Sequence, residues 1–424
     1  MKIGIQTWGT EGDVRPFFAL ARELGLRGHD VRVVYTSVEG RDFSALARDC
    51  GVRAASVGEA YFVRNKQHIA DASGAGFAIS NPMKQLELIF GLLMDPVLDP
   101  MLAAAADLVR DRDLLVAHFL CFPMAAAAMA KRRKLVGVAM QPVFPTRRYP
   151  PTGLPDLGGW LNPLSWRVVG AAVERIMAPR LNAMRARSGL PPLRDMQAHA
   201  TDDMALALVA LSPTLLPRPD DWHPRIHVSG FLGLPASAEQ WTPEPGLQSF
   251  LDAGEPPLFL SFGSMLTLDD GRAAESVGVF AEALELAGAR GVVQAQASVI
   301  ANAPRSARIH YLERAPHAQL FPRCAAVVHH GGAGTTQSAL LAGKPSVIVP
   351  HAADQFFFAD LLHARGCASK PLKRNALAPK ALAARVRRVL DDPTFAAKAK
   401  AMGEALARED GARHAADLIE ASAS

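Results

Sequence analysis

With 424 residues, the chain is too long for a single hydrophobic core, and two domains of roughly 200 residues each are expected. Its hydrophobic content of 49% and charged content of 21% are those of a globular protein, which excludes an intrinsically disordered chain. The formal net charge of +5 is small for this length, so the chain lacks the basic footprint of a nucleic-acid-binding protein, although it would mildly attract an anionic nucleotide.

The four cysteines predict buried free thiols in a reducing compartment, because none of them has the CxxC spacing of a zinc site or a redox motif. The N-terminus enters a predicted strand directly, without the basic and long apolar regions of a signal peptide. We find no apolar run of about 18 residues and therefore expect no transmembrane helix. The expected location is the cytoplasm. Peripheral membrane contact stays open, since Lys131–Lys134 is basic but short.

The opening of the chain alternates between strand and helix patterns. Lys2–Thr7 predicts a strand, and Trp8–Gly12 predicts a loop that contains glycine. Asp13 opens a helix that ends at Gly28, and Val31–Tyr35 predicts the next strand. This order predicts an open parallel sheet in the N-terminal half.

The middle of the chain is informative about architecture but carries no motif. Residues 61–110 contain methionine and leucine at helical spacing, which is typical of a core, and the alternative is an apolar pocket for a substrate. Residues 142–166 are rich in proline, glycine and aromatic side chains and predict a long surface loop, a kind of segment that often forms a lid. Residues 213–245 are proline-rich and unperiodic, and they predict an interdomain linker.

The most informative stretch is Val327–Thr336, which reads VVHHGGAGTT. Ala325–His329 predicts a strand, Thr335–Ala342 a helix and Ser346–Val349 a second strand, which together form a βαβ unit. The loop of such a unit lies at the carboxyl edge of the sheet, where ligands bind. Its glycines let backbone N–H groups approach an anion, and the helix N-terminus adds positive potential. The stretch predicts a diphosphate-binding loop in which His330 donates a hydrogen bond to phosphate.

Two common phosphate-binding loops do not match this stretch. No lysine precedes the threonines, which excludes a Walker loop, and the glycines do not fall as GxGxxG. An ordinary tight turn is the alternative for the glycines alone. Asp354 and Gln355, after the next strand, argue against that alternative, because a carboxylate and an amide suit adjacent hydroxyls of a hexose. A helix N-cap is the alternative for Asp354.

These residues resemble a known family. The segment His329–Thr336, followed by Pro350 and by Asp354-Gln355, is similar to the donor-binding motif of the nucleotide-sugar glycosyltransferases of the UDP-glycosyltransferase superfamily. Residues 354–360 look most like the sterol 3-beta-glucosyltransferase branch. The opening segment is similar to that branch and to the vancomycin-type antibiotic glycosyltransferases.

The resemblance spans residues 1–35 and 258–365 and implies the GT-B fold, an α/β architecture of two Rossmann-like parallel-sheet domains facing across a cleft. The organisation it implies is an acceptor-binding domain at 1–225, a linker at 226–245, a donor-binding domain at 246–395, and a C-terminal helix at 396–424 that crosses back to the first domain.

The resemblance also implies which residues bind the UDP-sugar donor. Ser264 belongs to a Phe-Gly-Ser turn that the family uses at the phosphates. Arg314 stands where plant relatives carry a tryptophan that stacks on uracil, and this departure leaves uracil and thymine both open. The candidate donor-binding residues are Ser264, Arg314, Ala315, His330, Gly332, Ala333, Gly334, Thr335, Asp354 and Gln355.

Asp13 has two interpretations. As an N-cap it would accept hydrogen bonds from the first helical turn. In the resembled family, the loop after the first strand carries the base that deprotonates the acceptor, and Gly12–Pro16 is similar to the Gly-Asp-Val-x-Pro pattern of the antibiotic and sterol branches. The helix N-terminus favours the carboxylate, which makes Asp13 a weaker base.

His118 follows the predicted strand Asp113–Ala117, at a place where family members with a histidine base often hold an orienting aspartate. We therefore predict an Asp13–His118 dyad in which either residue is the base, the imidazole being the better match near neutral pH. A solvent-facing histidine is the alternative.

The implied reaction is an inverting, metal-independent transfer of a hexose, glucose first among them, from a UDP-sugar to a hydroxyl of a lipophilic small molecule such as a sterol, hopanoid, polyketide or phenol. No Asp-x-Asp motif lies near the glycine loop, and no cofactor is expected. Two alternatives stay open: a UDP-sugar 2-epimerase on the same fold, and a non-catalytic partner protein that binds a nucleotide sugar. The candidate acceptor-binding residues are Trp8, Phe90, Met94, Phe119 and Tyr149.

Overall fold

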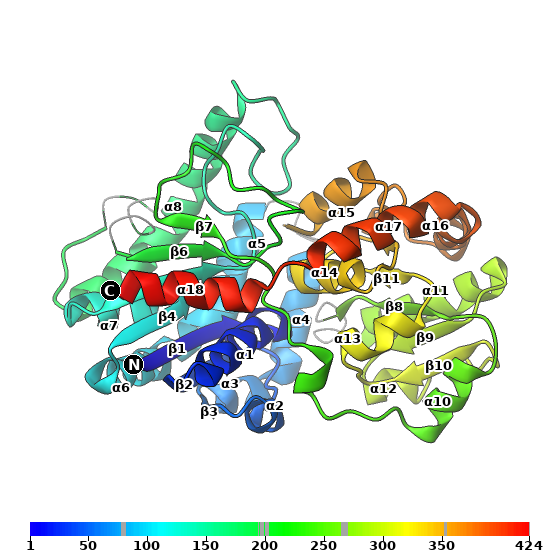
Figure 1. The fold of residues 1–424 in the computed structure, drawn as a ribbon, viewed down its shortest axis with the longest axis horizontal. Coiled ribbons are helices and arrows are strands. Elements are labelled where there is room, and N and C mark those ends of the chain that lie inside the picture. The colour runs from blue at the N-terminus through cyan, green and yellow to red at the C-terminus, as the bar shows by residue number, and fades with distance from the viewer. Residues whose placement is uncertain are drawn as a thin grey trace. The chain divides into compact units, whose positions relative to one another are not determined.

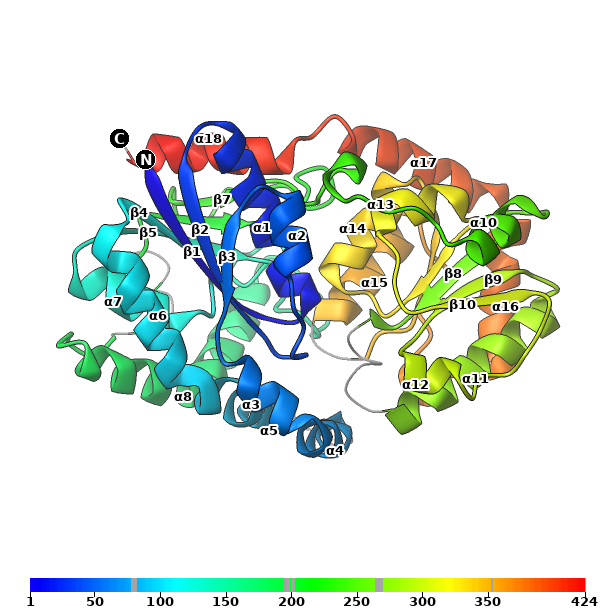
Figure 2. The ribbon, with the colours of Figure 1, turned by 90° about the horizontal axis from the view of Figure 1, so that it is seen from below.

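The computed structural model describes residues 1–77, 82–193, 195, 199, 203–263, 270–351 and 354–423. They form two compact units, each built on one parallel sheet (Figures 1 and 2). Unit 1 combines Met1–Leu234 with Asp410–Ser424, and unit 2 is Pro235–Glu409.

Unit 1 is built on a seven-stranded sheet with the order β3-β2-β1-β4-β5-β6-β7, and every neighbouring pair is parallel. The inner strands are buried along almost their whole length, as expected where helices cover both faces of a parallel sheet. The strands are β1 (Lys2–Gly9), β2 (Asp30–Ser37), β3 (Arg53–Ser56), β4 (Leu114–His118), β5 (Lys134–Ala139), β6 (Leu206–Val209) and β7 (Ile226–Val228).

The helical elements of unit 1 connect and cover these strands. They are α1 (Glu11–Leu26), α2 (Ser44–Asp49), α3 (Glu59–Arg64), α4 (Lys66–Phe77), α5 (Pro82–Ile89), a π turn η1 (Phe90–Met94), a 3-10 turn η2 (Asp95–Val97), α6 (Leu98–Asp111), α7 (Phe122–Ala130), α8 (Asn162–Arg187) and α18 (Gly411–Ala423).

The stretch Met83–Asp111, from α5 to α6, corrects an expectation. It is long and apolar enough to cross a membrane by length and composition, contrary to our prediction that no such segment exists. In the structure, a π turn and a 3-10 turn interrupt it, and 39% of its most apolar window is buried. Long core helices of globular proteins pass the same test, so length and composition decide nothing here.

The last helix, α18, belongs to the core of unit 1. Ala415, Ala416 and Ile419 are fully buried in the same cluster as the inner residues of α1, β1 and β4. At its polar edge, Arg27 binds Asp417 at 2.7 Å, and Figures 1 and 2 both show α18 along this unit.

Unit 2 is built on a five-stranded parallel sheet with the order β10-β9-β8-β11-β12. One face packs against α11 and α16, and the other against α10, α13 and α14. The elements are α10 (Pro245–Asp252), β8 (Leu258–Ser261), α11 (Asp270–Ala287), β9 (Gly291–Gln294), α12 (Ala297–Ile300), β10 (Ile309–Leu312), α13 (His317–Leu320), β11 (Val327–His329), α14 (Ala333–Leu341), β12 (Ser346–Ile348), α15 (Asp354–Ala364), α16 (Pro379–Asp391) and α17 (Pro393–Leu406), with 3-10 turns η3 (Ala236–Ala238), η5 (Phe321–Arg323) and η6 (Arg374–Ala376).

The boundaries differ from the predicted ones in three places. The segment 396–424 is not one helix. The helix α17 ends at Leu406 in unit 2, and a separate helix, α18, follows in unit 1. The predicted linker 226–245 begins with β7, which pairs with β6. The predicted loop 142–166 ends earlier, since α8 begins at Asn162 and buries Trp166.

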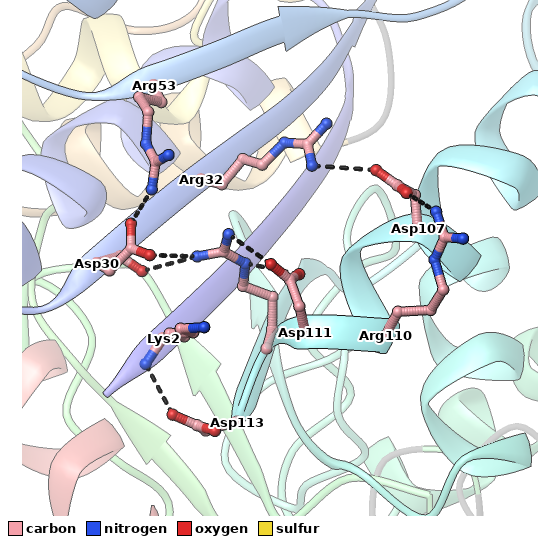
Figure 3. Close-up of polar contacts among 9 residues, drawn as sticks. Lys2, Asp30, Arg32, Arg53, Asp107, Arg110, Asp111 and Asp113 are labelled. Carbon is pink, nitrogen blue, oxygen red and sulfur yellow. Dashed lines mark hydrogen bonds and ion pairs between the residues drawn. The ribbon is translucent and has the colours of Figure 1, made fainter.

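A network of ion pairs joins the amino ends of the unit 1 strands (Figure 3). The buried Arg112 binds the Asp30 carboxylate at 2.9 Å, and Asp30 also pairs with Arg53 at the start of β3. The backbone N–H of Lys2 donates to the Asp113 carboxylate at 2.8 Å. This network stabilises the amino edge of the sheet, which is opposite the carboxyl edge where the candidate functional residues lie.

Candidate active site

Both sheets reverse their strand order at the first strand. β1 lies between β2 and β4, and β8 lies between β9 and β11. At such a reversal, the loops after the two central strands turn to opposite faces and leave a crevice at the carboxyl edge. The residues singled out by the sequence lie at the carboxyl ends of these strands: Asp13 follows β1, His118 is the last residue of β4, and His330 follows β11.

The turn after β1 holds the Asp13 carboxylate. Oδ2 accepts hydrogen bonds from the Thr10 backbone N–H at 2.8 Å and the Thr10 hydroxyl at 3.1 Å. Asp13 is thus the third residue of α1 and part of a capping box, not the N-cap that one interpretation expected. Gly9 has φ of +139°, and an added Cβ would lie 2.3 Å from Oδ2. Only glycine fits beside this carboxylate.

His118 lies at the end of β4 and faces Asp13. Ile5 pairs with Val116 and Gln6 with Ala117, so the ends of β1 and β4 lie side by side. His118 is buried, which contradicts the solvent-facing alternative, and its Nε2 is 3.5 Å from Asp13 Oδ1. The sequence-predicted pair is brought together.

The second ring nitrogen of His118 fixes the tautomer. The backbone N–H of Leu120 donates to Nδ1 at 3.2 Å, so Nδ1 supplies a lone pair. In the neutral ring the hydrogen is then on Nε2, which faces the carboxylate. His118 in this geometry is a donor toward Asp13 and has no lone pair directed to a substrate.

In unit 2, the His330 ring lies between two glycine turns. An added Cβ on Gly263, after β8, would lie 2.9 Å from its Cε1, and one on Gly332 would lie 2.5 Å from its Nε2. The ring is 8% exposed, and its Nδ1 has no hydrogen-bond partner among the described residues. A buried polar atom without a partner at a helix N-terminus is unusual and fits contact with a ligand.

The glycine loop also contacts the start of α15. Gly331 has φ of +93°, and a Cβ there would lie 2.9 Å from the backbone oxygen of Gln355. The Gln355 side-chain oxygen in turn accepts the backbone N–H of His351 at 2.7 Å. The loops after β11 and β12 therefore form one compact surface, with Gly332, Ala333, Gly334 and Thr335 half-buried along it.

Three histidines of this surface are held neutral at physiological pH. Burial lowers the pKa of His330 to about 4, and the positive potential of His317 contributes. Burial lowers the pKa of His351 to about 3, and it places the pKa of His329 well below its ordinary value. Neutral His330 carries one N–H, so it acts as a hydrogen-bond donor and not as a cation.

These depressed pKa values predict acid-sensitive stability. Between about pH 4 and 6.5 the unfolded chain binds a proton at residue 330 that the folded chain does not, so stability falls as the pH decreases through this window. The contribution of His330 is on the order of 3 kcal/mol. Thermal unfolding midpoints should be flat from pH 8 to 6.5 and then fall, with a shallower fall in His330→Asn. Equal slopes in both proteins would contradict this assignment.

The remaining donor candidates are placed less centrally. Arg314 is exposed after the edge strand β10, whereas Ala315 is buried in the core beneath it. Asp354 begins α15, where a carboxylate also stabilises the helix N-terminus, so its two interpretations stay open. Ser264 lies outside the described residues.

The acceptor candidates are interior residues of unit 1 and fall into two groups. Trp8 stacks on Phe90 with ring centroids 5.9 Å apart, and its Nε1 donates to the Leu93 oxygen, beside the fully buried Met94. Phe119 contacts Phe144, and Tyr149 contacts Trp222, which itself contacts Phe144. The burial of Phe90 and Met94 favours the packing interpretation of residues 61–110.

Sequence reasoning missed several supporting residues. Thr10 and Asp13 form a Thr-x-x-Asp sequence, a local capping signal that was available. His351 packs against Phe262 with ring centroids 4.7 Å apart, and the Arg374 guanidinium lies over the Phe262 ring at 5.7 Å from its centroid. No local sequence pattern predicts the roles of His351 and Arg374, because they reach Phe262 only through tertiary packing.

Comparisons with known proteins agree on one kind of enzyme. Residues 290–420 match the family model "Erythromycin biosynthesis protein CIII-like, C-terminal domain". The chain is 33% identical over 432 residues to O-mycaminosyltylonolide 6-deoxyallosyltransferase of Streptomyces fradiae, covering 99% of this chain and 97% of the relative. It is 30% identical over 432 residues to sterol 3-beta-glucosyltransferase UGT80B1 of Arabidopsis thaliana, covering 99% of this chain and 68% of the relative.

Solved structures share the fold. The glycotransferase of kitacinnamycin superposes with a TM-score of 0.70 at 21% identity and covers 99% of this chain and 98% of its own. Glycosyltransferase VinC in complex with DTDP gives a TM-score of 0.67 at 20% identity, covering 100% of this chain and 99% of its own.

Proposed function

The chain belongs to the UDP-glycosyltransferase superfamily of GT-B glycosyltransferases, and from this premise we propose that it transfers a hexose from a UDP-sugar to a hydroxyl of a lipophilic small molecule. The relatives named above act, by their names, on a sterol and on a macrolide, which supports a lipophilic acceptor. They transfer different sugars, so our choice of glucose rests on the likeness of residues 354–360 to the sterol branch.

The single observation that carries the donor assignment is the buried Nδ1 of His330, which has no partner among the described residues and belongs to the loop just before α14. Backbone N–H groups of the first turn of α14 would bind the diphosphate, together with the His330 N–H. Asp354 and Gln355 would bind hydroxyls of the hexose.

On the acceptor side we assign the base to Asp13. Its Oδ2 is occupied by Thr10, so Oδ1 is the atom that takes the proton of the acceptor hydroxyl. His118 faces the same oxygen as a donor and positions it. This proposal chooses between the two roles that the predicted Asp13–His118 dyad left open, in which either residue could be the base.

The proposed step is one direct displacement. The acceptor oxygen bonds to the anomeric carbon as the bond from that carbon to the β-phosphate oxygen breaks, and the acceptor proton passes to Asp13. The negative charge that develops on the departing diphosphate is stabilised by His330 and by the N-terminus of α14. Because these groups supply that stabilisation, we propose a reaction that needs no metal ion.

The test is UDP release from a panel of UDP- and dTDP-sugars, with and without mixed sterol and phenol acceptors, each in EDTA and in Mg²⁺. Acceptor-dependent release from UDP-glucose, unchanged by EDTA, is the expected result. Release that needs Mg²⁺ would overturn the metal-independent step. Epimerised sugar without acceptor consumption would instead support the epimerase alternative.

His118 offers a separate test of which residue is the base. His118→Gln keeps an N–H donor toward Asp13, so we expect kcat to fall by no more than about tenfold, whereas His118→Ala should fall by about 10- to 100-fold. In both variants, the pH profile of kcat/KM should keep its acidic limb. If that limb disappears in His118→Gln, the imidazole is the base and Asp13 is the positioning residue.

A further inference from the structure

One surface segment of unit 1 exposes an unusual concentration of apolar side chains. Residues 154–168 contain six large apolar residues that are between 44% and 96% exposed, and the other exposed large apolar residues described in the chain are scattered singly. Single exposed leucines are ordinary, but a cluster of this kind marks a contact surface. We call the cluster the apolar ridge; its members are Leu154, Leu157, Trp160, Leu161, Leu164 and Val168.

Hydrogen bonds hold the loop of the apolar ridge in place. The side chain of the buried Asn162 donates to the Arg147 oxygen at 3.1 Å and to the Asp156 carboxylate at 2.9 Å, and it accepts from the Leu157 N–H at 3.2 Å. Trp166 donates to the Tyr149 oxygen at 2.9 Å. The Asn162 side chain that makes these bonds is fully buried, while the largest side chain of the loop, Trp160, is 96% exposed. The segment is built to present apolar groups to its surroundings.

The ridge continues along α8. Leu161, Leu164 and Val168 follow one another at spacings of three and four residues, so they form a stripe on one side of the helix. Trp166 and Met177, on the opposite side, are buried. Figure 1 shows the start of α8 and the loop before it at the upper rim of unit 1.

Basic side chains surround the apolar ridge. Arg147, Arg148 and Arg167 are exposed beside it, and Arg175 lies seven residues after Val168 on the same side of α8. The carboxylates nearby are Asp156, which is held by Asn162 and Gly158, Asp221, which accepts from the Arg147 backbone N–H and the Thr146 hydroxyl, and the half-buried Glu174. Arginines therefore outnumber available carboxylates around an apolar centre that carries an exposed tryptophan.

We propose that the apolar ridge binds the surface of a bilayer that contains anionic lipids. Tryptophan prefers the membrane interface, where its ring is among acyl chains and its N–H among head groups, and leucine side chains on a helix face enter the same layer. The surrounding arginines pair with anionic head groups, which supplies the charge complementarity. This inference concerns a surface other than the donor and acceptor residues and does not depend on the proposed reaction.

The experiment is co-sedimentation of the full chain with vesicles of phosphatidylcholine alone or with 30% phosphatidylglycerol. We expect binding to the anionic vesicles that weakens in high salt, and at least about tenfold weaker binding to the neutral ones. Trp160→Ala and Leu164→Ser should each reduce binding by about tenfold. Leu26→Ser, at a leucine on α1 that is 68% exposed against 57% for Leu164, is the matched control and should bind as the parent does.

Three outcomes would overturn the proposal. The first is no binding to either vesicle, with circular dichroism showing a folded chain. The second is equal binding by Leu164→Ser and Leu26→Ser. The third is a dimer that Trp160→Ala converts to a monomer without any change in vesicle binding, since the ridge would then cover a second copy of the chain.

Discussion

Asp13→Asn is expected to lower kcat for sugar transfer by about 10²- to 10⁴-fold, because the amide cannot take the acceptor proton. The amide oxygen can still accept the Thr10 hydrogen bonds that hold the carboxylate, so α1 and the unfolding midpoint should change little. UDP binding, measured by calorimetry, should stay within about twofold of the parent, since no donor contact is lost.

The matched control is Asp49→Asn, an exposed aspartate at the end of α2, which should retain parental kcat. Near-normal turnover of Asp13→Asn across the pH range would contradict the assignment of the base. Loss of UDP binding in the same variant would show a structural defect instead, and the kcat value could not then be attributed to proton transfer.

His330→Ala is expected to lower kcat by about 10²- to 10³-fold, which is the effect of removing one preorganised donor from a developing negative charge. The pKa of about 4 makes the ring neutral at pH 7, so its contribution is a directed N–H and not a full charge. The loss should therefore be largely insensitive to ionic strength between 50 and 500 mM salt, over which the screening length falls from about 14 to about 4 Å.

His330→Asn separates the hydrogen bond from the packing. The asparagine amide can place an N–H near the position of Nδ1, so this variant should recover at least about tenfold of the activity lost in His330→Ala. His363→Ala, at an exposed histidine of α15, is the control that should leave kcat unchanged. Equal activity of the alanine and asparagine variants would show that ring packing, and not the donor, is what residue 330 supplies.

Sequence patterns predicted the structural elements whose determining residues are contiguous in the chain. The βαβ unit from Ala325 to Val349 appears as β11, α14 and β12, because its apolar runs and its glycine turn are contiguous in the sequence. The break between α17 and α18 escaped the same reasoning, since both helices continue one apolar period. At the start of α18 the chain packs closely on Phe231, since a Cβ on Gly411 would lie 2.3 Å from the Phe231 oxygen, and such a tertiary contact has no sequence pattern.

The sequence predicted which residues belong to the site better than it predicted how they are arranged. The proximity of Asp13 and His118 follows from β1 lying next to β4, and sequence spacing alone cannot give that adjacency. The resemblance to a known family supplied it. Which nitrogen of His118 faces Asp13 with a hydrogen depends on the Leu120 N–H, a backbone group with no sequence signature, and so the roles within the pair were left open.

The return of the chain to unit 1 has a consequence for building chimeric enzymes. Unit 2 is a continuous insertion, and its entry and exit meet at one place, where a Cβ on Gly230 would lie 2.6 Å from Gly411 Cα. A donor half from another enzyme is therefore best grafted at two neighbouring junctions, near residues 234 and 410, with α18 retained from the recipient. A graft at the first junction alone would exchange α18 as well and replace Ala415, Ala416 and Ile419, which complete the recipient's hydrophobic core.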